Sequence, residues 1–209
     1  MPVPATIQSA PDGAGSLTPG LSEPKLVVAF GDSLFSGYRL PRTQGFAPVL
    51  ERALIADGVA ARVVNAGVAG ETSAEGLQRL DTVLAGLDRK PDLVIVGLGA
   101  NDMLNRYDPD TPRANLEAIL AALKDRGIPA MLTGSLSVPD RKKAYAASFD
   151  SIYPRLALKY DVPLYPFFLQ GVLYHSDLML PDGAHPSAQG VAEIVRRILP
   201  TVKSALAIQ

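Results

Sequence analysis

The chain contains no cysteine, and this absence excludes several kinds of site at once. Without thiols there is no disulfide framework, no thiolate zinc site and no cysteine nucleophile. No stretch approaches the roughly 20 consecutive apolar residues of a membrane-spanning helix, so we expect no integral membrane segment. Basic and acidic residues nearly cancel to a formal net charge of -1. We therefore do not expect the protein to bind nucleic acid, which would require a strongly basic surface.

The composition that remains is typical of one globular domain. A chain of 209 residues is long enough for one well-filled core, and with 47% hydrophobic and 20% charged residues it lacks the signature of disorder. Residues 1–24 are rich in Pro, Gly, Ser and Ala, without the basic start and apolar segment of a signal peptide, and are predicted to form a flexible tail. We expect a single domain over residues 25–209. The tail is either the remainder of an export signal, which predicts a periplasmic or secreted protein, or the native extension of a cytoplasmic one.

From residue 25 onward, short apolar runs alternate with segments of helical periodicity, which predicts an α/β fold with a parallel sheet between helices. The expected strands are Leu26–Phe30, Arg62–Asn65, Leu93–Leu98, Ala130–Thr133 and Val162–Leu164. A helix should begin at Thr72 with a capping box to Glu75, and another at Thr111. A helix over residues 144–160 should be kinked or broken by Pro154, and a last helix after Ser187 should end by Pro200.

Ser33 follows the first predicted strand directly, in the segment Gly31-Asp32-Ser33-Leu34. In an open parallel sheet, ligands bind beyond the carboxyl ends of the strands, which makes Ser33 a candidate nucleophile. A turn or helix-capping serine is the alternative, because Ser and Asp favour such positions. We assign Asp32 mainly to shaping this turn. The segment does not match the G-x-S-x-G nucleophile elbow, which argues against an α/β-hydrolase.

Two further candidates follow the second and third predicted strands. Gly70 lies in a glycine-containing loop before a helix, where its backbone N–H is a candidate donor to an oxyanion. A loop glycine that needs a positive φ and a phosphate-binding loop are the alternatives, although the glycine spacing of phosphate-binding loops is missing. Asn101 follows the third strand, as a second donor or as an ordinary turn residue. Three consecutive strands thus deliver a hydroxyl, an amide N–H and a carboxamide to one edge of the sheet.

The chain has two histidines, of which His185 lies in Pro181-Asp182-Gly183-Ala184-His185-Pro186. A tight Asp-Gly turn lets the Asp182 carboxylate hold one imidazole nitrogen while the other faces a substrate, as a general base requires. An exposed turn with an incidental histidine is the alternative. His175 has no comparable partner, and we interpret it as structural or pocket-lining.

Taken together and in this order, these four blocks resemble the GDSL family of SGNH hydrolases, and the likeness extends from about residue 26 to residue 200. The sequence is most similar to the bacterial arylesterases and thioesterase I/lysophospholipases of that family. The resemblance implies a three-layer α/β/α sandwich, flavodoxin-like, around a five-stranded parallel sheet of order 2-1-3-4-5. It also implies a triad of Ser33, His185 and Asp182, and an oxyanion hole made by Ser33, Gly70 and Asn101.

The expected activity is hydrolysis of small-molecule carboxylic esters through an acyl-serine intermediate, with no metal and no cofactor. A non-catalytic flavodoxin-like module that binds a small ligand is the alternative. Met103, Tyr107 and Phe168 are predicted to bind the substrate, because they lie in two segments that should wall the sheet edge. For Phe168 the alternative is a core aromatic residue that does not face the site. These segments are too short for a deep tunnel, so short acyl or aryl esters are expected to be favoured, with thioesterase or lysophospholipase activity secondary. The sequence does not determine the oligomeric state.

Overall fold

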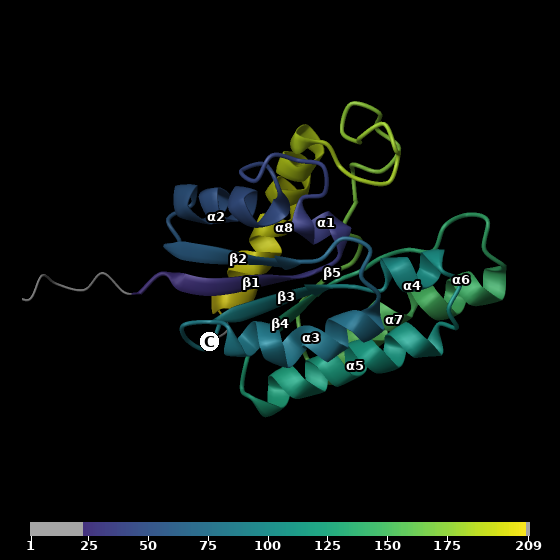
Figure 1. Cartoon of the computed structure of the whole chain (residues 1–209), viewed down its shortest axis with the longest axis horizontal. Coiled ribbons are helices and arrows are strands. Elements are labelled where there is room, and N and C mark those ends of the chain that lie inside the picture. The colour runs from purple at the N-terminus through teal and green to yellow at the C-terminus, as the bar shows by residue number, and fades with distance from the viewer. Residues whose placement is uncertain (1–22, 208–209) are drawn as a thin grey trace, which may run out of the picture.

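The computed structural model describes residues 23–207, so the predicted tail of residues 1–24 lies almost entirely outside the described residues. Its centre is a five-stranded sheet in the order β2-β1-β3-β4-β5, in which every pair of neighbours is parallel (Figure 1). The strands are β1 Lys25–Gly31, β2 Ala61–Gly67, β3 Leu93–Gly97, β4 Ala130–Thr133 and β5 Leu164–Tyr165. The predicted α/β fold and strand order are confirmed.

Helices cover both faces of this sheet and make a three-layer sandwich (Figure 1). They are α1 Ser33–Ser36, α2 Phe46–Ala56, α3 Ser73–Ala85, α4 Ala100–Leu104, α5 Asp110–Asp125, α6 Lys143–Asp150, α7 Ile152–Tyr160 and α8 Ala188–Ala207. Side chains of α2 and α8 share one core cluster with the sheet, and side chains of α3, α5 and α7 share the other. The central strands are fully buried because both of their faces are covered, which explains their nearly continuous apolar sequences.

The start of α3 agrees with the prediction, whereas the start of α5 does not. The Thr72 hydroxyl accepts a hydrogen bond from the Glu75 N–H, and the Glu75 carboxylate accepts one from the Thr72 N–H, which completes the capping box. Helix α5 already begins at Asp110, with Pro109 in the capping position, so the prediction of Thr111 as the cap is wrong. The Asp108 carboxylate accepts from the Asp110 N–H at 2.9 Å and so supports the earlier start.

Two prolines differ in their effect on helices. The predicted break near Pro154 occurs three residues earlier, between α6 and α7 at Ser151, because a proline ring clashes with the carbonyl four residues before it. The prediction that the last helix ends by Pro200 is wrong, since α8 continues to Ala207. Beyond the proline, Val202, Ala205 and Leu206 are buried in the core, and this burial keeps the last turns in place.

The last strand is shifted along the sequence from its predicted position. Instead of Val162–Leu164, the paired residues are Leu164 and Tyr165, opposite Leu132 and Thr133 of β4. Val162 lies just beyond α7 and bonds back to it, because its N–H donates to the carbonyl of Ala157. The shift moves the end of β5 level with that of β4, so the carboxyl ends of all five strands face the loops that hold the predicted site residues.

Candidate active site

Ser33 lies where β1 passes into the short helix α1. Asp32 caps this helix, since its carboxylate accepts a hydrogen bond of 3.0 Å from the Leu34 N–H. The first N–H groups of a helix have no partner within the helix. That of Ser33 donates to no other group in residues 23–207, so it remains available at the sheet edge.

The predicted turn brings Asp182 and His185 to Ser33. One oxygen of the Asp182 carboxylate accepts from the backbone N–H groups of Ala184 and His185, each at 3.0 Å. The other lies 3.0 Å from His185 Nδ1, and His185 Nε2 lies 2.9 Å from Ser33 Oγ. Gly183 has a φ of 67°, which allows the tight turn. Residues 152 positions apart thus form one continuous chain of hydrogen bonds.

The backbone of this turn also keeps Asp182 ionised. Its pKa is lowered to about 2, first by the hydrogen bond from the Ala184 N–H and then by those from the His185 N–H and imidazole. An ionised Asp182 accepts from a protonated Nδ1, which leaves Nε2 as the acceptor for the Ser33 hydroxyl. His185 is thus arranged to accept the proton of the Ser33 hydroxyl, as the activation of a serine nucleophile requires.

Two residues beside these hydrogen-bonded side chains, Tyr38 and Arg39, were not predicted from the sequence. The Tyr38 ring lies 4.5 Å from the His185 ring, measured between centroids, and Arg39 Nη1 lies 3.9 Å from an oxygen of Asp182. Arg39 has a φ of 58°, and its guanidinium lies over the Tyr38 ring. Both residues follow the predicted Ser33 block by only a few positions, but no periodicity or motif marks them.

Gly70 and Asn101 lie at the same edge of the sheet as Ser33. Gly70 has a φ of 80°, and its N–H donates to no other group in the described part of the chain. Asn101 follows Gly99, whose φ is 106°, and its Nδ2 donates to the carbonyl of Glu71 at 2.8 Å. The same Nδ2 lies 3.5 Å from a carboxylate oxygen of Asp32. The structure therefore brings together all five of the residues predicted for the triad and the oxyanion hole.

Asp32 is more than a turn-shaping residue, because its carboxyl group is almost fully buried beside Asn101. The pKa of Asp32 is raised to about 7, mainly by burial and also by the nearby charges of Glu71 and Asp102, against the lowering effect of the hydrogen bond from the Leu34 N–H. The sequence gives no sign of this, since Glu71 and Asp102 come from other segments of the chain.

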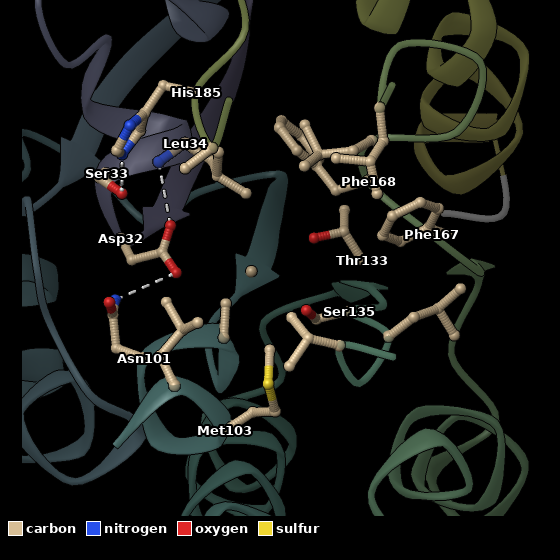
Figure 2. A pocket seen from close by; sticks show the side chains of 18 of the residues that line it. Asp32, Ser33, Leu34, Asn101, Met103, Thr133, Ser135, Phe167, Phe168 and His185 are labelled. Atoms are coloured by element: carbon tan, nitrogen blue, oxygen red, sulfur yellow. Dashed lines mark hydrogen bonds between the residues drawn. The ribbon is translucent and has the colours of Figure 1, made fainter. Parts of the chain in front are cut away.

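A pocket of about 670 Å³ extends from Ser33 and His185 between the loops at the sheet edge. Figure 2 shows these two residues on one side and Phe167, Phe168 and Thr133 together on the far side. The wall is mostly apolar and also includes Phe35, Leu98, Met103, Leu136, Val138, Pro139, Leu169 and Leu173. Ser33, Gly70 and Asn101 all line this pocket, so a substrate carbonyl at Ser33 has an apolar space beside it.

The three predicted substrate-binding residues have different positions. Met103 and Phe168 are buried and line the pocket. Phe168 also belongs to the core, with its ring centroid 4.9 Å from that of Phe35. Tyr107 does not line the pocket and is 44% exposed, because the chain turns away at Arg106, which has a φ of 63°. The pocket therefore supports the predictions for Met103 and Phe168 and does not support the one for Tyr107.

His175, interpreted from the sequence as structural or pocket-lining, is exposed and does not line the pocket. Thr133 and Ser135, at the end of β4, line the pocket and were not predicted. Among the described residues, no group of three or more His, Cys, Asp and Glu side chains is suited to hold a metal ion. Within residues 23–207, no helix is both long and apolar enough to cross a membrane.

Comparison with known proteins agrees with this geometry. Residues 29–192 match the model of the GDSL-like lipase/acylhydrolase family. An arylesterase of Vibrio mimicus is 36% identical, over 84% of this chain and 88% of its own length. The thioesterase 1/protease 1/lysophospholipase L1 of Escherichia coli K12 is 34% identical, over 77% of this chain and 75% of its own. The crystal structure of AlinE4, an SGNH-hydrolase family esterase, has 45% identity and a TM-score of 0.76, covering 90% of this chain and 99% of its own. This chain therefore belongs to the GDSL-like lipase/acylhydrolase family and is a carboxylic ester hydrolase.

Proposed function

We propose that the chain hydrolyses carboxylic esters with Ser33 as nucleophile, His185 as general base and Asp182 as the carboxylate that orients His185. The observation that carries this proposal is the chain of hydrogen bonds from Asp182 through His185 to Ser33, with distances of 3.0 and 2.9 Å. His185 takes the Ser33 proton as the oxygen attacks the acyl carbonyl, and returns it to the leaving alkoxide. Water then attacks the acyl-serine by the same route and releases the acid.

The N–H groups of Ser33 and Gly70 and the side chain of Asn101 are proposed to bind the oxyanion of the tetrahedral intermediate. All three line the pocket beside the Ser33 hydroxyl, and the two backbone N–H groups have no other partner within residues 23–207. The Asn101 amide donates to the Glu71 carbonyl at 2.8 Å, which holds the amide plane, and its other N–H makes only a long contact, with Nδ2 3.5 Å from the Asp32 carboxylate. This second N–H is the one proposed to donate to the oxyanion. Such preorganised donors stabilise charge that is present mainly in the transition state.

Covalent labelling tests the nucleophile. An organophosphonate should form one adduct, which mass spectrometry should map to Ser33, and Ser33→Ala should take up no label. That variant should keep less than about a thousandth of the wild-type rate while it remains folded, because the substitution removes a single oxygen. An unlabelled Ser33, or an active Ser33→Ala, would show that Ser33 is not the nucleophile.

The pocket supports a preference for short acyl esters, which we propose to have about two to eight carbons, with thioester hydrolysis secondary. Each methylene that the apolar wall covers gains about 0.8 kcal/mol, so kcat/KM should rise until the chain extends beyond the wall and should then fall. A series of p-nitrophenyl esters from acetyl to palmitoyl, with acyl-CoAs of the same lengths, measures this. A maximum at fourteen carbons or more would contradict the proposal.

Variants of the wall test which residues set this length. Met103→Ala and Phe168→Leu should shift the optimum toward longer chains, because both side chains are buried and line the pocket. Tyr107→Ala is the matched control, since it removes a large side chain that lies outside the pocket. If the optimum is unchanged in both wall variants, Met103 and Phe168 belong to the core alone.

A further inference from the structure

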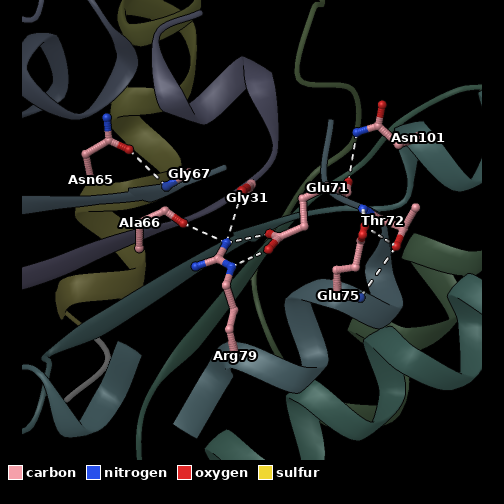
Figure 3. Close-up of polar contacts among 9 residues, drawn as sticks. All are labelled: Gly31, Asn65, Ala66, Gly67, Glu71, Thr72, Glu75, Arg79 and Asn101. Atoms are coloured by element: carbon pink, nitrogen blue, oxygen red, sulfur yellow. Dashed lines mark hydrogen bonds and ion pairs between the residues drawn. The ribbon is translucent and has the colours of Figure 1, made fainter. Parts of the chain in front are cut away.

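Arg79, on α3, makes contacts with three separate segments at the sheet edge (Figure 3). Its Nη2 donates to the carbonyl of Ala66 at 2.8 Å, to that of Gly31 at 3.3 Å and to the Glu71 carboxylate at 2.5 Å. Its Nε donates to the other oxygen of Glu71. The side chains of Arg79 and Glu71 are only 20% and 4% exposed, so this is a largely buried ion pair.

These segments carry two of the proposed oxyanion donors, Ser33 and Gly70, and hold the third, Asn101, through a hydrogen bond. Gly31 ends β1, two residues before Ser33, and Ala66 lies near the end of β2, where the loop to Gly70 begins. Glu71 directly follows Gly70, and its backbone carbonyl accepts the hydrogen bond from the Asn101 side chain. One guanidinium group thus connects the supports of all three donors. Neither Arg79 nor Glu71 lines the pocket, so the pair has no direct contact with a substrate there.

Gly70 depends on such support because it has little packing of its own. It is exposed, has a positive φ, and a Cβ added to it would meet no atom within 4 Å. A glycine of this kind is free to change its φ and ψ unless its neighbours are fixed. Its nearest fixed neighbour is Glu71, whose carboxylate binds Arg79 and whose carbonyl binds Asn101. Donors of an oxyanion hole stabilise the transition state fully only when they are held in place before the reaction.

We propose that Arg79 and Glu71 form a positioning pair that fixes the N–H of Gly70 and the side chain of Asn101 relative to Ser33. This inference rests on the proposed function, because it assigns the pair a task in that reaction. The start of α3 has independent anchors, namely the Thr72 capping box and the bonds from the Ser73 N–H and hydroxyl to Asp102 at 2.8 and 2.6 Å. Loss of the pair should therefore disturb the loop before α3 more than the helix itself.

Arg79→Gln is the first test. We expect kcat to fall about tenfold to a hundredfold with KM nearly unchanged, because a displaced donor weakens binding of the oxyanion and not of the ester. Arg79→Lys should recover only part of the loss, since a single ammonium group does not reproduce the several directed bonds of a guanidinium. Arg126→Gln is the matched control: it removes the exposed pair between Arg126 and Asp81, another residue of α3, and should leave kcat unchanged.

A double-variant comparison separates positioning from general support of the fold. If Arg79 acts through the oxyanion hole, Arg79→Gln combined with Asn101→Ala should lose less than the product of the two single losses. Glu71→Gln keeps the size of the side chain and leaves Arg79 bound to the carbonyls of Gly31 and Ala66. It therefore replaces Arg79→Gln as the test if that variant does not fold. It should lower kcat roughly tenfold, again without a change in KM.

Three outcomes would overturn the inference. The first is a wild-type kcat in Arg79→Gln or in Glu71→Gln, and the second is an effect on KM alone. The third is a loss of kcat in the double variant that equals the product of the losses in Arg79→Gln and Asn101→Ala. Phosphonate labelling distinguishes these from a failure of the proposed function. If the wild-type protein takes no label on Ser33, the proposed function fails. If the wild type is labelled and Arg79→Gln keeps its full kcat, only the positioning role of the pair is wrong.

Discussion

Asp182 and His185 lie on an exposed turn, whereas the groups around the proposed oxyanion hole lie beside buried charges. The Asp182 side chain is 25% exposed, and His185, whose imidazole it binds, is only three residues away in the sequence. By contrast, Asp102 is fully buried, and its bond to the Ser73 N–H joins residues 29 positions apart. The orientation of His185 is thus set by local turn geometry, and that of the proposed oxyanion hole by the tertiary structure. The two sides should respond differently to substitution.

The exposed side should show the larger effect on rate. Asp182→Asn is expected to lower kcat by about 10⁴-fold, because an amide does not fix the imidazole tautomer or stabilise the imidazolium. Stability should change little, since Asn keeps a side-chain oxygen for the N–H groups of Ala184 and His185. Steady-state kinetics with a thermal unfolding curve measure both quantities. Activity near that of the wild type would mean that another group orients His185.

On the buried side, Asn101→Ala should lower kcat by about 10² to 10³-fold, with little change in KM. Unlike Asp182→Asn, it should also lower the melting temperature, because it leaves the Glu71 carbonyl without its side-chain donor. A variant that mainly raises KM would move Asn101 from transition-state binding to ground-state binding. Unchanged stability in both variants would remove the contrast between the two sides.

A pH series sharpens the contrast through Asp32. Its pKa is about 7 in the folded protein, against an ordinary value of 3.8, because the buried carboxyl group resists ionisation. The stability that protonated Asp32 contributes is therefore complete below about pH 4 and is lost as the pH rises through about 7. Asp32→Asn should lack this loss while it keeps the cap of α1.

The measurement is the free energy of unfolding of both proteins between pH 4 and pH 8. Relative to the variant, the wild type should lose stability as the pH rises, by at most about 4 kcal/mol. Asp182, whose pKa is lowered to about 2, should contribute almost no such change over this range. Its carboxylate stays ionised in the folded protein and is also largely ionised in the unfolded chain above its ordinary pKa. A constant difference between wild type and Asp32→Asn would show that Asp32 ionises normally.

Chelation should have the smallest effect of all. EDTA is expected to leave kcat and KM unchanged, because His185 and the three oxyanion donors supply the proton transfer and the charge stabilisation that the proposed mechanism needs. Dialysis against EDTA, with wild-type rates measured before and after, checks this. A loss of activity that added metal restores would contradict the mechanism on both sides of the site.

The same difference explains how much of the site the sequence predicts. Asp182 and His185 are visible because their contact is local, within one turn of four residues. Ser33, Gly70 and Asn101 are visible because each follows a strand, and parallel strands end at one edge. The Arg79–Glu71 pair, the raised pKa of Asp32 and the contact of Tyr38 with His185 are not visible, since each depends on segments that only the folded chain brings together.

The errors in the fold have a similar origin. The alternation of strands and helices predicts the parallel sheet, and the family resemblance implies its strand order, but the position of β5 was missed because Val162 bonds back to the end of α7. Pro200 was expected to end α8 on local grounds, whereas burial of Val202 and Leu206 in the core outweighs the lost hydrogen bond. Tyr107 was placed in the pocket by its neighbourhood in the sequence, and a single turn at Arg106 removes it.

The parallel sheet has a practical consequence for attaching this enzyme to a surface. Strand β1 begins at Lys25 and reaches the site only at its other end, seven residues and about 23 Å later. Helix α8 begins just after His185 and runs 20 residues, about 30 Å, back to Ala207. A tether fused before Lys25 or after Ala207 would therefore hold the molecule with its pocket turned toward the solution, and immobilised enzyme should keep the chain-length preference of the free protein.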